Sequence, residues 1–166
     1  MSARQEDIKE CLFNEGFRLM RETDLDDVIS IEEAVYPFPW TRGIFSDCIN
    51  IGYLCLVLEI NEKVVAYSVM SVAAGESHLL TIVVAKDEQG KGYGNKMLNE
   101  AIRLAAYDNA STMYLEVRTS NKTAIKLYHK RGFNELGIRS NYYPAEQGRE
   151  DALILALDLS FESTSN

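Results

Sequence analysis

The sequence has few of the residues that build metal sites and disulfide frameworks. Its 166 residues include three cysteines and two histidines. The cysteines (Cys11, Cys48 and Cys55) are odd in number and show no C-x-x-C spacing, so neither a disulfide framework nor a zinc site is indicated. His78 and His129 are too far apart in sequence to suggest a histidine-based metal site. We therefore expect reduced, structural cysteines and no metal.

Long apolar runs and an excess of basic charge are also missing. No run approaches the ~20 apolar residues of a membrane helix. The first ten residues, MSARQEDIKE, lack the apolar core of a signal peptide, so we expect a cytoplasmic protein. The formal net charge of −8 argues against broad nucleic-acid binding, which needs a basic footprint. An acidic chain is compatible with a basic peptide partner, and equally with solubility alone.

The length and the ordinary composition predict one domain with a core of its own. We expect an N-terminal extension at residues 1–16, the folded domain at 17–159 and a flexible tail at 160–166. The residue patterns predict the element order β-α-α-β-β-β-α-β-α-β-β. The runs 78–85 and 112–118 flank a helix, and such a crossover implies a parallel strand pair. We expect a mixed, mostly antiparallel α/β sheet with helices on both faces.

Local signals predict several element boundaries. Thr23 is a candidate N-cap for the first helix. Two β-rich runs are separated by only Asn61 and Glu62, which is typical of a hairpin. Gly132 is a candidate C-terminal cap for the last helix, and we expect the final two strands to pair over a longer loop. The apolar stripe of the first helix comprises Leu25, Val28, Ile31 and Val35.

Three glycines alternate in the segment QGKGYG, between a strand-like run and a helix-like run. A glycine-rich turn that opens a helix aims backbone N–H groups and the helix dipole at one point, which suits a pyrophosphate. The segment lacks both the Gly-Lys-[Ser/Thr] ending of a Walker loop and the G-x-G-x-x-G spacing of the dinucleotide fingerprint. From the glycines alone, phosphate binding and a flexible connection are equal alternatives.

The surrounding segments resemble the Gcn5-related N-acetyltransferases. Residues 89–94 match that family's Q/R-x-x-G-x-G/A signature, in which the loop holds the acetyl-CoA pyrophosphate. Residues 120–133, SNKTAIKLYHKRGF, are similar to its N-x-x-A-x-x-L-Y-x-x-x-G-F segment. The segments YPFPW, YLEVR, SNYYP and GREDALILAL narrow the resemblance to the bacterial enzymes that acetylate the N-terminal alanine of small-subunit ribosomal protein eighteen. Ser140 departs from that pattern, where arginine is usual.

The resemblance implies a role for each matching position. Glu116 corresponds to the general base and Tyr128 to the general acid for the leaving CoA thiolate. A tyrosine with a reference pKa near ~10 is protonated at neutral pH and can donate. The residue patterns alone leave Glu116 open as a solvated or ion-paired strand residue, Tyr128 as a packed aromatic and Asn121 as a helix N-cap. The implied acetyl-CoA contacts are Ile82, Val83, Val84, Gln89, Gly90, Lys91, Gly92, Tyr93, Gly94, Asn95 and Asn121.

The expected acceptor is an amine that attacks the thioester directly. Deprotonating an α-amino group near pH 7 costs roughly 1 kcal/mol, whereas a lysine costs about 4.6 kcal/mol, so a single carboxylate base suits an N-terminal amine better. Other protein N-termini, lysines, small amines, or acetyl-CoA binding without turnover are the alternatives. Candidate peptide contacts, unless they are simply core aromatics, are Tyr36, Phe38, Trp40, Tyr142 and Tyr143.

Overall fold

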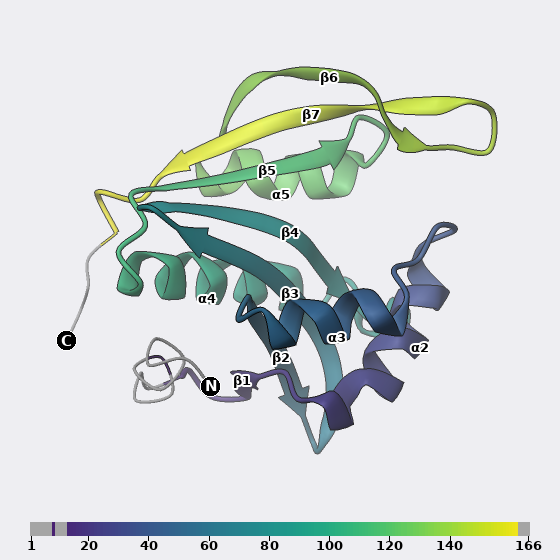
Figure 1. Cartoon of the computed structure of the whole chain (residues 1–166), viewed down its shortest axis with the longest axis vertical. Helices are drawn as coiled ribbons and strands as arrows, with labels where there is room; N and C mark the ends of the chain where they lie inside the picture. The colour runs from purple at the N-terminus through teal and green to yellow at the C-terminus, as the bar shows by residue number, and fades with distance from the viewer. Residues whose placement is uncertain (1–7, 9–12, 163–166) are drawn as a thin grey trace.

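The computed structural model describes residue 8 and residues 13–162, and seven strands within them form one mixed sheet (Figure 1). The strands are β1 Phe17–Leu19, β2 Leu54–Ile60, β3 Lys63–Ala73, β4 Glu76–Val84, β5 Thr112–Arg118, β6 Asn134–Pro144 and β7 Arg149–Asp158. The helices are α2 Leu25–Val35, α3 Arg42–Asn50, α4 Tyr93–Tyr107 and α5 Lys122–Arg131, with 3-10 turns η1 Glu22–Asp24 and η2 Lys86–Glu88. The predicted order of helices and strands is confirmed.

The sheet has the spatial order β1-β2-β3-β4-β5-β7-β6. Strands β4 and β5, joined through α4, are parallel, and every other neighbouring pair is antiparallel. The helical crossover between 78–85 and 112–118 therefore produces the parallel pair that the sequence predicts. Because β4 is the middle strand of this order, the end of β4 and the start of α4 lie near the middle of the sheet.

Alternation along the strands divides the core into two layers. In β2, Leu54, Leu56 and Leu58 join the cluster that contains the buried face of α4. The intervening Cys55 and Val57 join the cluster formed with α2 and α3. Successive strand side chains point to opposite faces, so the helices cover both faces of the sheet as predicted (Figure 1).

Several predicted boundaries match the structure. Asn61 and Glu62 both have positive φ, 50° and 64°, as the tightest hairpin turns require. Gly132 caps α5 in the left-handed region with φ of 106°. The predicted longer loop between the last two strands is wrong, because β6 and β7 extend until only residues 145–148 separate them.

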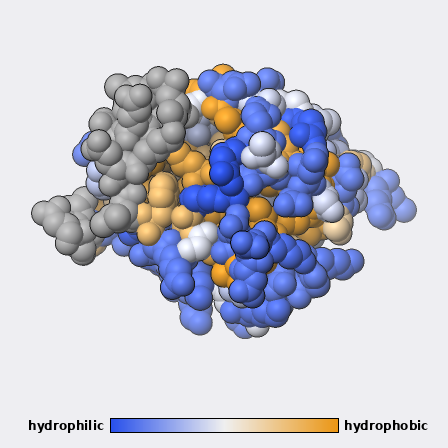
Figure 2. All heavy atoms as spheres, turned by 90° about the horizontal axis from the view of Figure 1, so that it is seen from below, coloured by the Kyte–Doolittle hydropathy of each residue, from blue (hydrophilic) through white to orange (hydrophobic). Residues whose placement is uncertain are grey.

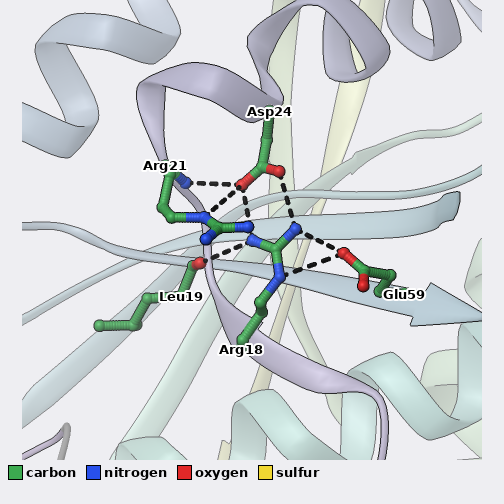
Figure 3. A network of polar contacts seen from close by, with 5 residues as sticks. All are labelled: Arg18, Leu19, Arg21, Asp24 and Glu59. Atoms are coloured by element: carbon green, nitrogen blue, oxygen red, sulfur yellow. Dashed lines mark hydrogen bonds and ion pairs between the residues drawn. The ribbon is translucent and has the colours of Figure 1, made fainter. Parts of the chain in front are cut away.

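The predicted N-cap at Thr23 is also wrong, because an ion-pair network sets the start of α2 (Figure 3). Thr23 lies inside the 3-10 turn η1, and α2 begins at Leu25 after Asp24. The guanidinium of Arg18 donates to both carboxylate oxygens of Asp24, at 2.7 and 2.8 Å, and to Glu59 at 2.6 Å. The Asp24 carboxylate also accepts from the backbone N–H of Arg21 at 2.8 Å. The network joins β1, η1 and β2.

The segment before β1 contributes to the fold. Ile8 is 1% exposed and belongs to the core cluster of α4. The Asn14 side chain donates to the buried carboxylate of Glu100 at 2.6 Å, which also accepts from Arg103. The expectations for residues 1–7, 9–12 and 163–166, including Cys11, lie outside the described residues.

Figure 2 shows one face of the molecule, on which hydrophobic residues appear in patches between hydrophilic ones. Within the described part of the chain, no helix has the length and apolar character needed to cross a bilayer.

Candidate functional site

The site lies where the two parallel strands separate. Hydrogen-bonded pairing between β4 and β5 runs from Glu76 with Thr112 to Leu79 with Leu115 and then stops. The register of β4 against β3 shifts at the same point, between Thr81 and Leu79, as at a β-bulge, which bends a strand. Figure 1 shows the two strands adjacent at one end and apart at the other. Beyond the split, the β4 backbone groups on the β5 side do not pair with β5.

A pocket of about 320 Å³ occupies this split. It is lined from β4 by Leu79, Leu80, Thr81 and Ile82, from β5 by Glu116, Val117 and Arg118, and from α5 by Asn121, Ala124 and Tyr128. Helix α2, the segment after it and strand β6 complete the wall with Glu32, Tyr36, Phe38, Trp40, Tyr143 and Pro144. Volume and mixed polarity are those of a small-molecule site.

Glu116 enters the pocket from the α2 side of the sheet. Its neighbours Leu115 and Val117 belong to the α4 and α5 cluster, so alternation places Glu116 on the opposite face. Its side chain is 11% exposed, and its Oε2 lies 2.6 Å from Nε2 of His78 on β4. Among the described residues, none hydrogen-bonds its other oxygen, Oε1. The carboxylate is thus held at one oxygen only.

Tyr128 reaches the pocket from the α5 side. The residue is 5% exposed and its ring packs against Phe133, with ring centroids 5.6 Å apart. Burial raises the pKa of its phenol above the ordinary value, with smaller contributions from Tyr36 and Tyr143. No described residue hydrogen-bonds its hydroxyl, so a neutral donor is available at the pocket wall.

The glycine segment forms the start of α4. Gly92 is the N-cap in the left-handed region with φ of 85°, and Gly90 has φ of 81°. A Cβ at either position would meet nothing within 4 Å, so the open space here is next to the backbone itself. The N–H groups of a first helical turn have no intrahelical acceptors, which supports the anion-site reading of these glycines.

The side chains around these glycines fix the loop from within. Gln89 donates to the carbonyl of Val84 at 3.2 Å, and Lys91 pairs with Glu88 at 2.7 Å. The remaining loop positions of the predicted set, Tyr93, Gly94 and Asn95, form the first turn of α4. Gln89 thus joins the loop to the end of β4, and Lys91 joins it to η2.

The other predicted cofactor positions fall into two groups. Asn121 is the N-cap of α5, because its side chain accepts from the N–H of Ala124 at 3.2 Å, and it also lines the pocket. Ile82 lines the pocket, whereas the side chain of Val83 is buried in the α2 and α3 cluster. Val84 packs against the other cluster. Any contact from Val83 to a ligand in the split would therefore use its backbone.

Four of the five predicted aromatic contacts line the pocket, namely Tyr36, Phe38, Trp40 and Tyr143. Tyr142 does not line it. Its ring packs edge-on against Tyr143, with centroids 4.9 Å apart, and carries the guanidinium of Arg139 at 5.3 Å. Tyr142 therefore packs against the pocket residue Tyr143 without lining the pocket itself.

Two charged pocket residues were missed by the sequence reasoning. Glu32 is 2% exposed, and its carboxylate accepts from the backbone N–H of Trp40 at 3.1 Å and from the hydroxyl of Tyr67. Its position seven residues after Leu25 put it on the buried helix face, and this spacing was the available signal. Arg118 stacks on Tyr143 at 4.5 Å and pairs with Glu150 at 3.1 Å.

The described residues contain no group of three or more His, Cys, Asp or Glu side chains arranged to hold a metal ion. Cys48 and Cys55 are free, buried thiols. Burial raises the pKa of the Cys55 thiol to about 12, so it stays protonated and does not act as a nucleophile at neutral pH.

Comparison with known proteins agrees with this arrangement. Residues 25–133 match the model of the acetyltransferase (GNAT) family. The [ribosomal protein bS18]-alanine N-acetyltransferase of Escherichia coli (strain K12) is 40% identical over 141 residues, which cover 85% of this chain and 95% of the relative. The protein of the same name from Haemophilus ducreyi is 36% identical over 83% of this chain and 96% of its own length.

Solved structures show the same fold. The crystal structure of the ribosomal-protein-S18-alanine N-acetyltransferase from Escherichia coli superposes with a TM-score of 0.82 at 37% identity, covering 90% of this chain and 97% of the other. Arabidopsis thaliana Naa50 in complex with the bisubstrate analogue CoA-Ac-MVNAL gives a TM-score of 0.75 at 23% identity, covering 86% and 97%. At that identity the likeness concerns the fold alone.

Proposed function

Because the chain belongs to the acetyltransferase (GNAT) family, whose members use acetyl-CoA, we propose that it acetylates the N-terminal alanine of small-subunit ribosomal protein bS18. The observation that carries this proposal is its identity, over most of both chains, with the Escherichia coli relative named for that reaction. A ribosomal acceptor implies that the protein works in the cytoplasm.

We assign acetyl-CoA to the split between β4 and β5. The pyrophosphate is assigned to the N–H groups at the start of α4, in the open space beside Gly90 and Gly92. The pantetheine arm is assigned to the unpaired edge of β4 at Ile82–Val84, where it can pair much as a neighbouring strand would. Asn121 is assigned a hydrogen bond to the same arm. The thioester then lies in the pocket that Glu116 and Tyr128 line.

The chemistry assigned to the pocket is direct transfer. The acceptor amine attacks the thioester carbonyl, a C–N bond forms and the C–S bond breaks. Glu116 takes the proton lost by the amine, directly or through a water, and Tyr128 gives a proton to the departing thiolate. The two groups enter from opposite faces of the sheet, so that one can face the acceptor amine and the other the leaving sulfur.

The test uses a synthetic peptide with the first residues of bS18, followed by mass spectrometry and by release of free CoA. We expect one acetyl group on the α-amine and none on a matched peptide whose α-amine is already acetylated and whose lysines are free. Glu116→Gln should lower kcat by about 10²-fold, the usual size of a general-base contribution, with little change in acetyl-CoA affinity. An unchanged rate would remove Glu116 as the base.

Other outcomes would decide between the alternatives. Turnover on small amines or lysines but not on the bS18 peptide would overturn the acceptor while keeping the enzyme class. Tight acetyl-CoA binding without turnover on any amine would favour a binding module. Mass spectrometry of bS18 from cells with and without this protein would test the same acceptor in its natural setting.

A further inference from the structure

Resting on the proposed function, we infer that His78 is a positioning residue for Glu116. Nε2 of His78 lies 2.6 Å from Oε2 of Glu116. An ionised carboxylate can only accept hydrogen bonds, so Nε2 carries the proton in the neutral imidazole. His78 therefore donates to one oxygen of the base and leaves Oε1 for the amine or a bridging water.

The backbone makes this contact possible. His78 pairs across the parallel ladder with Tyr114. Two residues further along β5, Glu116 lies on the same face as Tyr114 and just beyond the last paired residues. His78 thus sits on the rigid, paired side of the split, and Glu116 on the open side. The imidazole therefore keeps the Glu116 carboxylate close to β4 at a point where the β5 backbone is no longer paired with β4.

His78 is not part of the pocket wall. Its side chain is 38% exposed, whereas that of Glu116 is 11% exposed. The imidazole thus reaches solvent and contacts Glu116 from outside the pocket lining. This placement distinguishes a residue that acts through Glu116 from one that touches the reactants.

Other charged groups do not replace this contact. Arg118, the cation two residues along the same face of β5, is engaged by Glu150 at 3.1 Å and by the carbonyl of Pro144 at 2.8 Å. In the described part of the chain, no second side chain hydrogen-bonds Glu116. Of the other titratable groups, Tyr114 on β5 pairs with His78, and the pocket is also lined by Glu32 on α2, Tyr36 just after α2, Tyr128 on α5 and Tyr143 on β6.

The experiment compares His78→Gln and His78→Leu with the native protein on the same peptide at pH 8. Glutamine keeps an N–H donor, and leucine removes it. We expect His78→Leu to lower kcat about 10-fold at pH 8, the equivalent of one hydrogen bond to a charged group, while His78→Gln keeps most of kcat. The KM for acetyl-CoA should be unchanged in both.

The difference in kcat between His78→Gln and His78→Leu is the decisive quantity, because both variants remove the imidazole and only the glutamine keeps a donor for Glu116. His129→Leu is the matched control at the other histidine of the chain, which pairs with Glu135 at 3.1 Å outside the pocket. We expect this variant to keep native kcat.

Two results would overturn the inference. One is native kcat in His78→Leu, and the other is an equal loss of kcat in His78→Gln and His78→Leu. Thermal unfolding of each variant checks that the comparison is made on folded protein. Absence of peptide acetylation by the native protein would instead refute the proposed function, so the two failures are distinguishable.

Discussion

At the scale of single residues, the hydroxyl of Tyr128 can be tested by removing one atom. Tyr128→Phe keeps the ring that packs against Phe133 but removes the proton proposed for the thiolate. We expect kcat to fall by about 10²-fold, with acetyl-CoA affinity and melting temperature close to native. Steady-state kinetics and calorimetric titration with acetyl-CoA measure the two effects separately.

Tyr142→Phe is the matched control for that change. Tyr142 contacts the pocket residue Tyr143 edge-on but does not itself line the pocket. The same loss of a hydroxyl should leave kcat within about 2-fold of native, since most surface substitutions away from a site change little. Equal losses in the two variants would argue that the wall, and not the acid, had been damaged.

Burial also predicts how Tyr128 behaves with pH. Because desolvation raises the pKa of the phenol above its ordinary value, the protonated form is present throughout the neutral and mildly alkaline range. The pH–rate profile of the native protein should therefore show no loss of activity from this group below pH ~10. A loss near pH 8 that disappears in Tyr128→Phe would contradict the assignment.

At the scale of elements, the loop before α4 can be tested through its backbone. Gly92 has φ of 85° and open space where a Cβ would lie. Gly92→Ala should cost about 1–2 kcal/mol in the free energy of unfolding, because an L side chain disfavours the left-handed region. If the loop holds the pyrophosphate, acetyl-CoA affinity should also fall. Urea unfolding and calorimetric titration measure the two quantities.

Gly148→Ala separates these two effects. Gly148 has φ of 72° and equally open space, but it lies in the turn between β6 and β7. The stability loss should match that of Gly92→Ala, while acetyl-CoA affinity stays native. If both variants bound acetyl-CoA equally well, the start of α4 would not be the phosphate site.

The elements themselves were predictable because their signals are local. The apolar stripe of α2, the Asn61 and Glu62 turn and the Gly132 cap each depend on residues close in sequence. The start of α2 was misplaced because Arg18 of β1, which also donates to Glu59 of β2, engages Asp24. That interaction has no signal in the helix sequence.

The site was predictable only in part, for a related reason. Motif resemblance supplied the candidate base, acid and loop, but the pocket depends on where β4 and β5 stop pairing. A parallel register is set by the crossover helix and by packing, not by adjacent residues. The contact between His78 and Glu116, 38 positions apart, follows from that register and could not be read from the sequence.

At the scale of the whole molecule, the Arg18 network links stability to pH. Burial acts to raise the pKa of Asp24, but hydrogen bonds from Arg18 and Arg21 outweigh it and hold the pKa below the ordinary value of 3.8. A carboxyl with a lowered pKa in the folded state stabilises the fold above its unfolded pKa. That contribution is lost as the pH falls through the lower, folded-state value.

Asp24→Asn should therefore destabilise the protein most at neutral pH. The Asp24 side chain is 7% exposed and its charge faces a guanidinium, so we expect a loss of about 1–3 kcal/mol in the free energy of unfolding at pH 7. The difference between native and variant should shrink as the pH falls below ~4, because native Asp24 becomes neutral too.

Asp26→Asn is the matched control. Asp26 also pairs with an arginine, Arg42, but its side chain is 90% exposed, and exposed pairs contribute little. Urea unfolding from pH 7 to pH 3 measures all three proteins. A difference for Asp24→Asn that did not vary with pH would show that the carboxylate charge is not what joins β1 and β2 to the start of α2.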